Sequence, residues 1–288
     1  MSQFGKNASA DTQTPLVSVI IPTLNRAWAV GKAIDSVLFQ DYPNFELILV
    51  DDGSRDQTRS LLSAYQSRII YIHQPNQGVS AARNRGIAAA SGDLIAFLDS
   101  DDYWLPGKLS EQVRFFNAHP DALICQTEEI WIRNGRRVNP RRHHKKPAGN
   151  IFIPSLELCL VSPSAVMAKK ALFAEIGGFD EDLPACEDYD LWLRVSCRYP
   201  VHLIQTPLIV KKGGHADQLS RQPGLDKYRI FAIEKILAGR SLTNEQYRAA
   251  VKVLKQKCQS YAAGCKKRGK NAEADYYLGL ARQHTEEG

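Results

Sequence analysis

Hydrophobic runs alternate with segments of helical spacing along the first hundred residues. Residues 16–22 (LVSVIIP) form a β-branched run without alternation, which is typical of a strand buried on both faces of a parallel sheet. Residues 27–40 follow with apolar side chains on one helical face. The same pattern predicts further strands at 45–54, 68–74 and 93–99 and helices at 56–66 and 78–92. This βαβαβαβ order predicts an α/β fold: an open, mostly parallel sheet flanked by helices.

The rhythm changes after Pro106. A predicted helix at 107–120 precedes a strand that turns at Asn134-Gly135, a strong hairpin signal. Earlier in the chain, we expect Asp56 to cap the second helix and Gly92 to close the third. From about Leu225 the pattern is helical and charged. We therefore expect a disordered tail at 1–15, one domain at 16–220 (halves 16–105 and 106–220), and a helical extension at 221–288 that serves dimerisation or membrane docking.

Composition narrows the class of protein only slightly. The 288 residues are 44% hydrophobic and 24% charged, with a formal net charge of +6 that favours anionic partners without choosing one. The six cysteines are scattered without a CxxC pair, which predicts reduced thiols in a cytoplasmic protein. No apolar segment approaches the roughly 20 residues that span a bilayer. We expect a protein that is soluble or peripheral at the inner face of a membrane.

Polar side chains follow the predicted strands at three places. These are Thr23–Arg26, Asp51–Ser54 and Asp99–Asp102. Open α/β sheets bind ligands outside the carboxyl ends of their strands. We therefore expect all three groups to converge on one rim of the sheet.

The acidic cluster Asp99–Asp102 has two interpretations. Neighbouring carboxylates repel one another, so the cluster either faces water in a loop or surrounds a cation. Mg²⁺ and Mn²⁺ prefer oxygen ligands, and Mg²⁺ takes one or two protein carboxylates together with substrate phosphates. The chain contains no GxxxxGK[ST] loop, and no GxGxxG follows the first strand.

The stretch VDDGS is first of all a turn. A carboxylate at this rim also suits a hydrogen bond from a nucleobase or a ribose hydroxyl. Arg83 lies near the start of the third helix and hence near the rim, whereas Arg85 points elsewhere around the helix.

Two other segments have open interpretations. The basic run 141–146 is either a solvated loop or a contact with an anionic membrane or phosphorylated acceptor, through Arg141, Arg142, Lys145 and Lys146. It lacks interleaved aromatic residues, which argues against nucleic-acid binding. Residues 158–167 line an acceptor pocket or belong to the core.

Three segments together carry a family resemblance. Residues 17–58 (VSVIIPTLNR…LVDDGSRDQT), 76–109 (NQGVSAARNRG…FLDSDDYWLPGKL) and 177–195 (GGFDEDLPACEDYDLWLRV) resemble the GT-A glycosyltransferases of family 2. The resemblance implies the GT-A fold and inverting transfer of a sugar from a nucleotide-diphosphate donor, with a UDP-sugar favoured, to a hydroxyl acceptor. It also implies a role in assembling a glycan or cell-surface polysaccharide on a glycan or lipid-linked acceptor.

The resemblance also implies roles for individual residues. Matching positions suggest that the donor nucleotide is held by Pro22, Thr23, Asn25, Asp51, Asp52, Arg83, Asp99 and Ser100. The DxD motif would bind Mn²⁺ or Mg²⁺ through Asp99 and Asp101, with His215 from a glycine-flanked loop. Asp188 of the Glu187-Asp188 pair would be the catalytic base, and both acids also suit the start of a helix. Base and metal would then lie on opposite sides of the sugar.

Two alternatives from other classes remain. A nucleotidyltransferase that makes nucleotide-sugars would carry a glycine-rich basic loop after the first strand, which residues 22–30 (PTLNRAWAV) lack. A non-catalytic nucleotide-sugar-binding module would not need both Asp101 and Asp188. A homodimer is a further expectation for the assembled protein.

Overall fold

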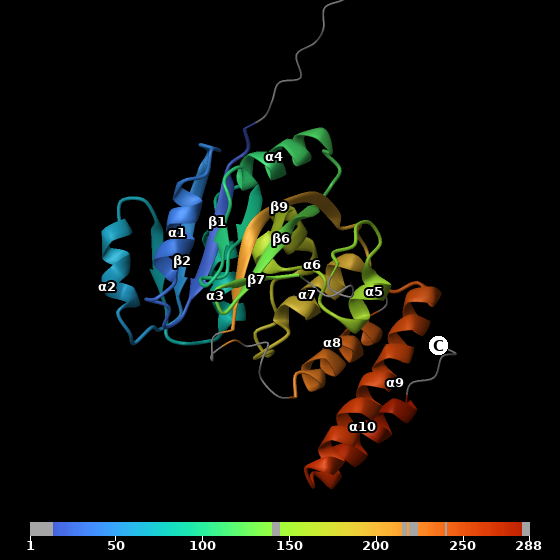
Figure 1. Ribbon diagram of the computed structural model, residues 1–288. Helices are drawn as coiled ribbons and strands as arrows, with labels where there is room; N and C mark the ends of the chain where they lie inside the picture. The colour runs from blue at the N-terminus through green and yellow to red at the C-terminus, as the bar shows by residue number, and fades with distance from the viewer. Residues whose placement is uncertain (1–13, 140–144, 215–217, 219–223, 240, 284–288) are drawn as a thin grey trace, which may run out of the picture.

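The computed structural model describes residues 14–139, 145–214, 218, 224–239 and 241–283. A curled sheet occupies the middle of the molecule, with helices on both faces and a helical C-terminal part that leads away from it (Figure 1). Of the predicted tail, only Thr14 and Pro15 are described. Their carbonyl oxygens accept hydrogen bonds from Asn44 Nδ2 at 2.7 Å and from the Tyr42 hydroxyl at 2.6 Å.

The described elements follow one another in α/β order. The strands are β1 (Val17–Thr23), β2 (Phe45–Asp51), β3 (Ile70–His73), β4 (Leu94–Phe97), β5 (Tyr103–Trp104), β6 (Ile124–Arg133), β7 (Arg136–Val138), β8 (Val166–Lys169) and β9 (His202–Gly213). The helices are α1 (Val30–Leu38), α2 (Thr58–Leu62), α3 (Val79–Ala89), α4 (Lys108–Ala118), α5 (Phe152–Glu157), α6 (Lys170–Ile176), α7 (Glu187–Ser196), α8 (Asp226–Ala238), α9 (Asn244–Lys267) and α10 (Asn271–Gln283). Short 3₁₀ turns cover Ser63–Tyr65 and Pro163–Ala165.

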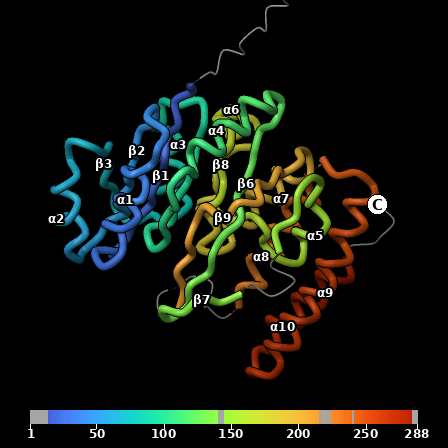
Figure 2. Tube along the Cα trace, turned by 45° about the horizontal axis from the view of Figure 1, so that its top comes forward, coloured from blue at the N-terminus to red at the C-terminus, as the bar shows by residue number. Residues whose placement is uncertain are grey.

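The sheet has the strand order β3-β2-β1-β4-β8-β6-β9-β5, with β7 paired to β6. The first half is parallel, because β1 pairs in parallel with β2 and β4, and β2 with β3. β8 runs antiparallel to both β4 and β6, and β9 returns parallel to β6. Figure 2 shows β8, β6 and β9 continuing the sheet beyond β1. The predicted α/β sheet is confirmed, and β8 joins its parallel first half to β6 and β9.

Burial on both faces explains the unbroken apolar strands. Val19 and Ile21 of β1 pack with α1 and α4 in one core, whereas the intervening Ile20 packs with α3, α6 and α7 in a second core. All three side chains are fully buried. Successive side chains of a strand point to opposite faces, so a strand covered by helices on both sides requires apolar residues throughout.

A third core joins the C-terminal helices to the sheet domain. Leu156 of α5 and Tyr189 and Leu193 of α7 pack with apolar residues of α8, α9 and α10. Thr243 caps α9 in a capping box with Gln246. The C-terminal helices therefore share their core with the helix that begins at the Glu187-Asp188 pair.

The predicted hairpin is confirmed, and the predicted helix end is not. Asn134 and Gly135 both have positive φ, 49° and 75°, between β6 and β7. α3 ends instead at Ala90, before Gly92. A Cβ at Gly92 would lie 2.4 Å from the carbonyl oxygen of Leu16. Gly92 is thus needed for a close approach between chain segments, not for the left-handed end of a helix.

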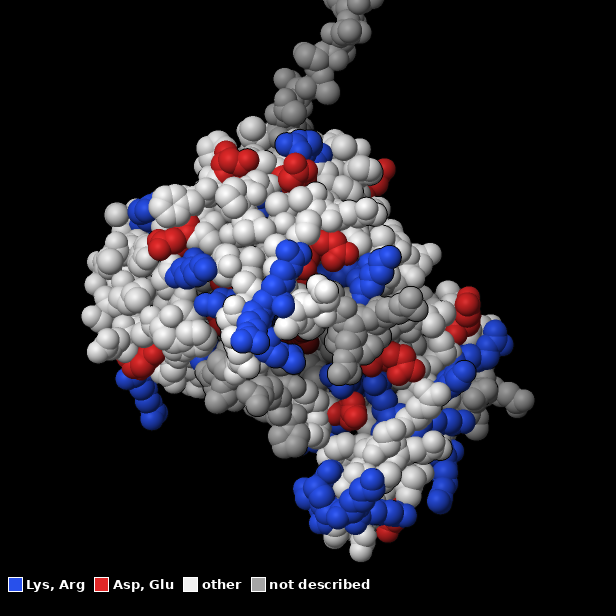
Figure 3. All heavy atoms as spheres, viewed as in Figure 1, with Lys and Arg blue, Asp and Glu red and all other residues white. Residues whose placement is uncertain are grey.

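Positive charge is uneven over the surface. Lys and Arg side chains gather over the end of the α9–α10 hairpin (Figure 3), where Lys266, Lys267, Arg268 and Lys270 are exposed. All six cysteines are free, as predicted. Within the described ranges, no helix combines the length and the apolar character needed to cross a bilayer.

Candidate active site

The predicted rim encloses a cavity of about 720 Å³. Its walls include Thr23 after β1, Asp52 after β2, Asp99–Asp102 after β4, and Glu187 and Asp188 at the start of α7. Pro22, Asn25, Arg83 and Ser100 also line it. The expected convergence of strand ends is therefore observed, and α7 brings the second acidic pair to the same space.

The two acids of the VDDGS turn lie differently. Asp52 lines the cavity, and its carboxylate accepts hydrogen bonds from Gln77 N at 2.9 Å and Gly78 N at 2.8 Å, which fixes the start of α3. Asp51 is fully buried outside the cavity wall, where it accepts from the Tyr71 hydroxyl at 2.9 Å. The geometry favours Asp52 over Asp51 for a contact with a nucleoside.

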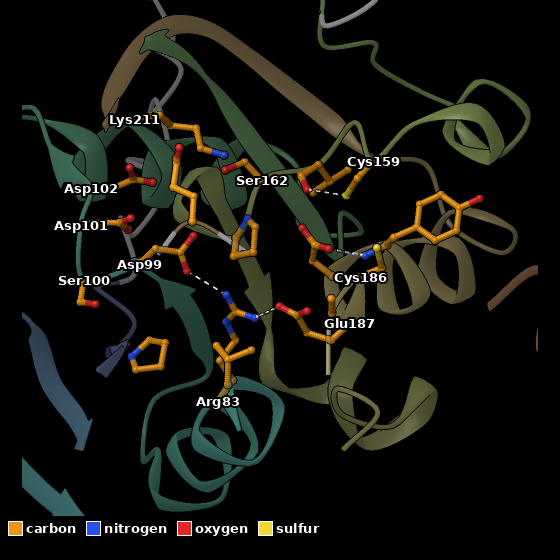
Figure 4. A pocket seen from close by; sticks show the side chains of 18 of the residues that line it. Arg83, Asp99, Ser100, Asp101, Asp102, Cys159, Ser162, Cys186, Glu187 and Lys211 are labelled. Carbon is orange, nitrogen blue, oxygen red and sulfur yellow. Dashed lines mark hydrogen bonds and ion pairs between the residues drawn. The ribbon is translucent and has the colours of Figure 1, made fainter. Parts of the chain in front are cut away.

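Arg83 connects the two acidic motifs. Its Nη2 lies 2.8 Å from Asp99 Oδ1 and its Nη1 lies 2.6 Å from Glu187 Oε1. Figure 4 shows the guanidinium between them, with Asp101 and Asp102 beyond Asp99. Burial opposes ionisation of Asp99, but Arg83, Lys211 and the hydrogen bond with Ser164 together lower the pKa of that carboxyl. Arg83 thus fixes the loop at Asp99 relative to the start of α7 at Glu187.

Asp102 is turned into the protein. It is 4% exposed, and its carboxylate accepts from Ser164 Oγ at 2.7 Å and from Lys212 N at 2.9 Å. Burial, opposed by Lys211 and reinforced by Asp101 and Asp99, raises the pKa of Asp102 to about 8. Asp102 therefore anchors the DxD loop to β9.

Lys211 brings a positive charge to the acidic wall. Burial would lower the pKa of its ammonium, but Glu129, Asp102, Asp99 and Asp188 together raise it. The ammonium is consequently held in its charged form. In Figure 4 the Lys211 side chain reaches toward Ser162, on the side of the cavity away from Arg83.

Lys146 belongs to this wall and not to a membrane-facing loop. Its Nζ lies 2.8 Å from Glu129 Oε2, and the two side chains are only 4% and 7% exposed. Trp131 Nε1 donates to the other oxygen of Glu129 at 2.7 Å. The prediction of membrane contact was wrong for Lys146, because β6 supplies it with a buried counter-charge. Lys145 is exposed, and Arg141 and Arg142 lie outside the described residues.

The start of α7 presents Asp188 to the cavity. Asp188 is partly exposed, and its Oδ1 accepts from Tyr189 N at 2.7 Å. The Cys159 thiol, which also lines the cavity, donates to the Val161 carbonyl oxygen at 3.3 Å, and burial, reinforced by Asp188, raises the pKa of this thiol. Asp190, two residues on, is 1% exposed and pairs with Arg194 and Lys235. Of the two aspartates, Asp188 is the one that a ligand can reach.

The residues present suit a divalent cation shared with a ligand. Among the described side chains, no group of three or more His, Cys, Asp and Glu forms a complete metal cage. Asp99 is engaged by Arg83 through one oxygen, and Asp102 is buried, so the partly exposed Asp101 is the carboxylate of this loop that a cation in the cavity would reach first. One or two carboxylates completed by phosphate oxygens and water fit Mg²⁺ or Mn²⁺. His215 lies outside the described residues.

Several residues in the wall or directly behind it had no signal in the sequence. Ser164 donates to Asp102 and accepts from Asp99 N at 3.1 Å, yet it lies in an ordinary apolar segment. Residues 158–163 line the cavity, whereas Val166 and Met167 belong to the core. The Glu129–Lys146 pair is formed only by the folding back of the chain after β7. In the sequence, Glu129 and Lys146 are recognisable only as charged residues, and charge alone does not identify a partner.

Comparisons with known proteins agree with this geometry. The model of the family described as glycosyl transferase family 2 matches residues 18–177. The putative colanic acid biosynthesis glycosyl transferase WcaA of Escherichia coli is 35% identical over 205 residues, which are 64% of this chain and 67% of that protein. The matches to uncharacterized glycosyltransferases of Rickettsia species cover from 32% to 66% of those proteins, so this chain corresponds to only part of their length.

Solved structures show the same fold. Staphylococcus aureus TarS in complex with UDP-GlcNAc superimposes with a TM-score of 0.66 at 18% identity, over 93% of this chain and 91% of that one. The mannosyltransferase PcManGT of Pyrobaculum calidifontis, in complex with GDP-Man and Mn²⁺, gives 0.62 at 17% identity over 94% and 76%. The GT-A fold predicted from the sequence is confirmed. With more than half of its length matched by the family model, the chain belongs to glycosyl transferase family 2.

Proposed function

We propose that the cavity binds a nucleotide-diphosphate sugar and a hydroxyl acceptor, and that the protein transfers the sugar with inversion of the anomeric carbon. The observation that carries this proposal is the Arg83 bridge. It holds the DxD loop and the Glu187-Asp188 pair at two sides of one cavity, 2.8 Å and 2.6 Å from a single guanidinium. Inversion requires a leaving-group site and a base on opposite sides of the sugar, and these motifs supply the two.

Each chain residue then has a defined task. Asp188 accepts the proton of the acceptor hydroxyl as that oxygen attacks the anomeric carbon. Glu187 is 5% exposed and bound to Arg83, so it positions the start of α7 and does not take the proton. Asp52 and Thr23 line the end of the cavity nearest β1 and β2, where a nucleoside would lie. Lys211 offers positive charge to the diphosphate.

A divalent cation at Asp101 would neutralise the negative charge that develops on the departing diphosphate. Asp101 and one oxygen of Asp99 are the carboxylate ligands that the described residues would offer. His215, which lies outside the described residues, is the further ligand that the family resemblance implies. Mn²⁺ in the structurally similar PcManGT supports this choice of metal class.

The class of donor and the biosynthetic role are proposed from similarity to known proteins. UDP-GlcNAc in the TarS complex favours a UDP-sugar, whereas GDP-Man in PcManGT makes a GDP-sugar the alternative donor. WcaA and the teichuronic acid glycosyltransferase TuaG, both named for polysaccharide biosynthesis, support a role in assembling a surface glycan. The acceptor would be a growing glycan or a lipid-linked one.

The test separates donor binding from transfer. A panel of UDP- and GDP-sugars with Mn²⁺ or Mg²⁺ is scored by thermal shift and by slow hydrolysis of the donor. In Asp188→Asn we expect unchanged donor binding and about 10²–10⁴-fold slower hydrolysis, the usual contribution of a general base. Asp182→Asn, an exposed acid of the loop before α7, is the matched control. Full turnover in Asp188→Asn, or no stabilisation by any nucleotide-sugar, would overturn the proposal.

A further inference from the structure

The C-terminal helices contribute to the cavity wall. Leu225 and Arg229, at the start of α8, line the cavity together with Cys186 and Asp188. α8 lies outside the segment matched by the family model, which ends at residue 177. The family match therefore does not extend to this part of the wall.

α8 is held firmly against the loop and helix that carry Asp188. The Cys186 thiol donates to the Leu225 carbonyl oxygen at 3.8 Å. At the other end of α8, Lys235 lies 2.5 Å from Asp180 and 3.1 Å from Asp190. The shared apolar core of α7, α8 and α9 adds to these contacts. Because both ends of α8 are tied to the same structure, the position of Arg229 relative to Asp188 is defined.

Positive charge is in excess on the α8–α9 side of this wall. Arg229 Nη1 pairs with Asp226 at 3.0 Å, while its Nε is buried without a hydrogen-bond partner among the described residues. Lys257 of α9 is 9% exposed. Burial is the main cause of the lowered pKa of its ammonium, while the nearby Asp226 raises this pKa and Arg229 lowers it. Asp226 thus pairs with Arg229 through Nη1, whereas Lys257 Nζ donates to the Glu157 carbonyl oxygen at 3.0 Å.

We propose that Arg229 forms a subsite for an anionic group on the acceptor, a carboxylate or a phosphate carried by the sugar whose hydroxyl reaches Asp188. This inference rests on the proposed function, since it takes Asp188 as the base and so assigns the neighbouring wall to the acceptor. A guanidinium is suited to bidentate recognition of carboxylate and phosphate. It would discriminate acidic from neutral acceptors at the same position.

The experiment measures charge selectivity directly. The full chain is titrated calorimetrically with three probes: p-nitrophenyl β-D-glucoside, the matching β-D-glucuronide, and the glucoside 6-phosphate, each with and without UDP and Mn²⁺. One charge-assisted hydrogen bond gives roughly tenfold tighter binding or more, so we expect at least one anionic probe to exceed the neutral glucoside by that factor. The carboxylate and phosphate arms identify which anion is recognised.

Variants assign the selectivity to Arg229. In Arg229→Gln the preference should fall to within about twofold, and in Arg229→Lys it should be partly retained. Arg282→Gln, an exposed arginine of α10, should leave it unchanged. Urea unfolding of each variant checks that the fold is intact, since a purely structural role would change stability but not the ratio of affinities.

The outcomes separate this inference from the proposed function. Equal affinity for the three probes, no detectable binding of either anionic probe, or a preference that survives in Arg229→Gln would overturn the inference. UDP binding and donor hydrolysis in the same samples report on the proposed function independently. An anion preference that depends on Arg229, in a protein that binds no nucleotide, would place an anion site at Arg229 but overturn its assignment to an acceptor, together with the proposed function.

Discussion

The guanidinium of Arg83 donates to the carboxylate of Glu187 across 2.6 Å, although the residues are 104 positions apart in the chain. The pair is buried, with side chains 4% and 6% exposed. The same guanidinium holds Asp99, so one side chain joins α3, the end of β4 and the start of α7. This connection explains how the Glu187-Asp188 pair and the Asp99–Asp102 loop, from distant parts of the sequence, keep a constant separation.

Removing the shared cation should therefore damage both stability and turnover. In Arg83→Met, the buried carboxylate of Glu187 and the partly exposed one of Asp99 lose their partner, and we expect a loss of about 3–5 kcal/mol in the free energy of unfolding, measured with urea. Arg85→Met, at an exposed position on the same helix, should change it by less than about 0.5 kcal/mol. Equal stability of the two variants would show that the bridge is dispensable.

Metal affinity should depend on Asp101. Replacing this carboxylate in Asp101→Asn should weaken Mn²⁺-dependent stabilisation by a nucleotide-sugar by roughly 10–100-fold, the effect of losing one charged ligand. The measurement is the shift in Tm as Mn²⁺ is titrated at fixed UDP-sugar. Asp121→Asn, exposed and outside the cavity wall, serves as the control. Unaltered Mn²⁺ dependence in Asp101→Asn would assign the cation to other ligands.

Lys108 predicts that the free energy of unfolding depends on pH, and this effect does not involve the cavity. The side chain is fully buried over the Trp104 ring, 4.2 Å from its centroid, and burial lowers the pKa of its ammonium to about 7 from 10.5. Between those values the unfolded chain binds more protons than the native one, so the free energy of unfolding should rise as the pH increases from about 7 to about 10.

The readout is the slope of stability against pH. Lys108→Met removes the titrating group, so the rise should be smaller than in the unaltered protein, by up to about 1.4 kcal/mol for each pH unit. Lys252→Met, an exposed lysine of α9, should keep the original slope. Parallel curves for Lys108→Met and the unaltered protein would mean that Lys108 is not held neutral.

Two glycines should respond to alanine with opposite sign. A Cβ at Gly92 would approach the backbone oxygen of Leu16 to 2.4 Å, so Gly92→Ala forces backbone movement and should cost more than about 1 kcal/mol. Gly31 lies inside α1, and its new Cβ would meet Tyr65 Oη at 3.6 Å, an ordinary contact. Gly31→Ala should therefore stabilise by up to about 1 kcal/mol through helix propensity. Chemical denaturation compares both variants, and a neutral Gly92→Ala would contradict the close approach.

Much of the predicted fold rested on local sequence patterns. The β-branched runs, the helical spacing and the Asn134-Gly135 turn each depend on neighbouring residues, and each was found in the structure. The rule that parallel strands end at one edge was enough to bring Thr23, Asp52 and the DxD loop to one cavity. These inferences need only the periodicity of the backbone and the direction of the strands.

Contacts between distant segments could not be predicted from the sequence. Nothing local distinguishes Lys146, buried against Glu129, from Lys145, which is exposed. Likewise Gly92 has the appearance of a helix end until the position of Leu16 is known, and Arg229 is one charge among many until α8 packs beside Asp188. The reason is physical: the energy of a buried charge or a close contact depends on what lies opposite it, and only the packing of the whole chain decides that.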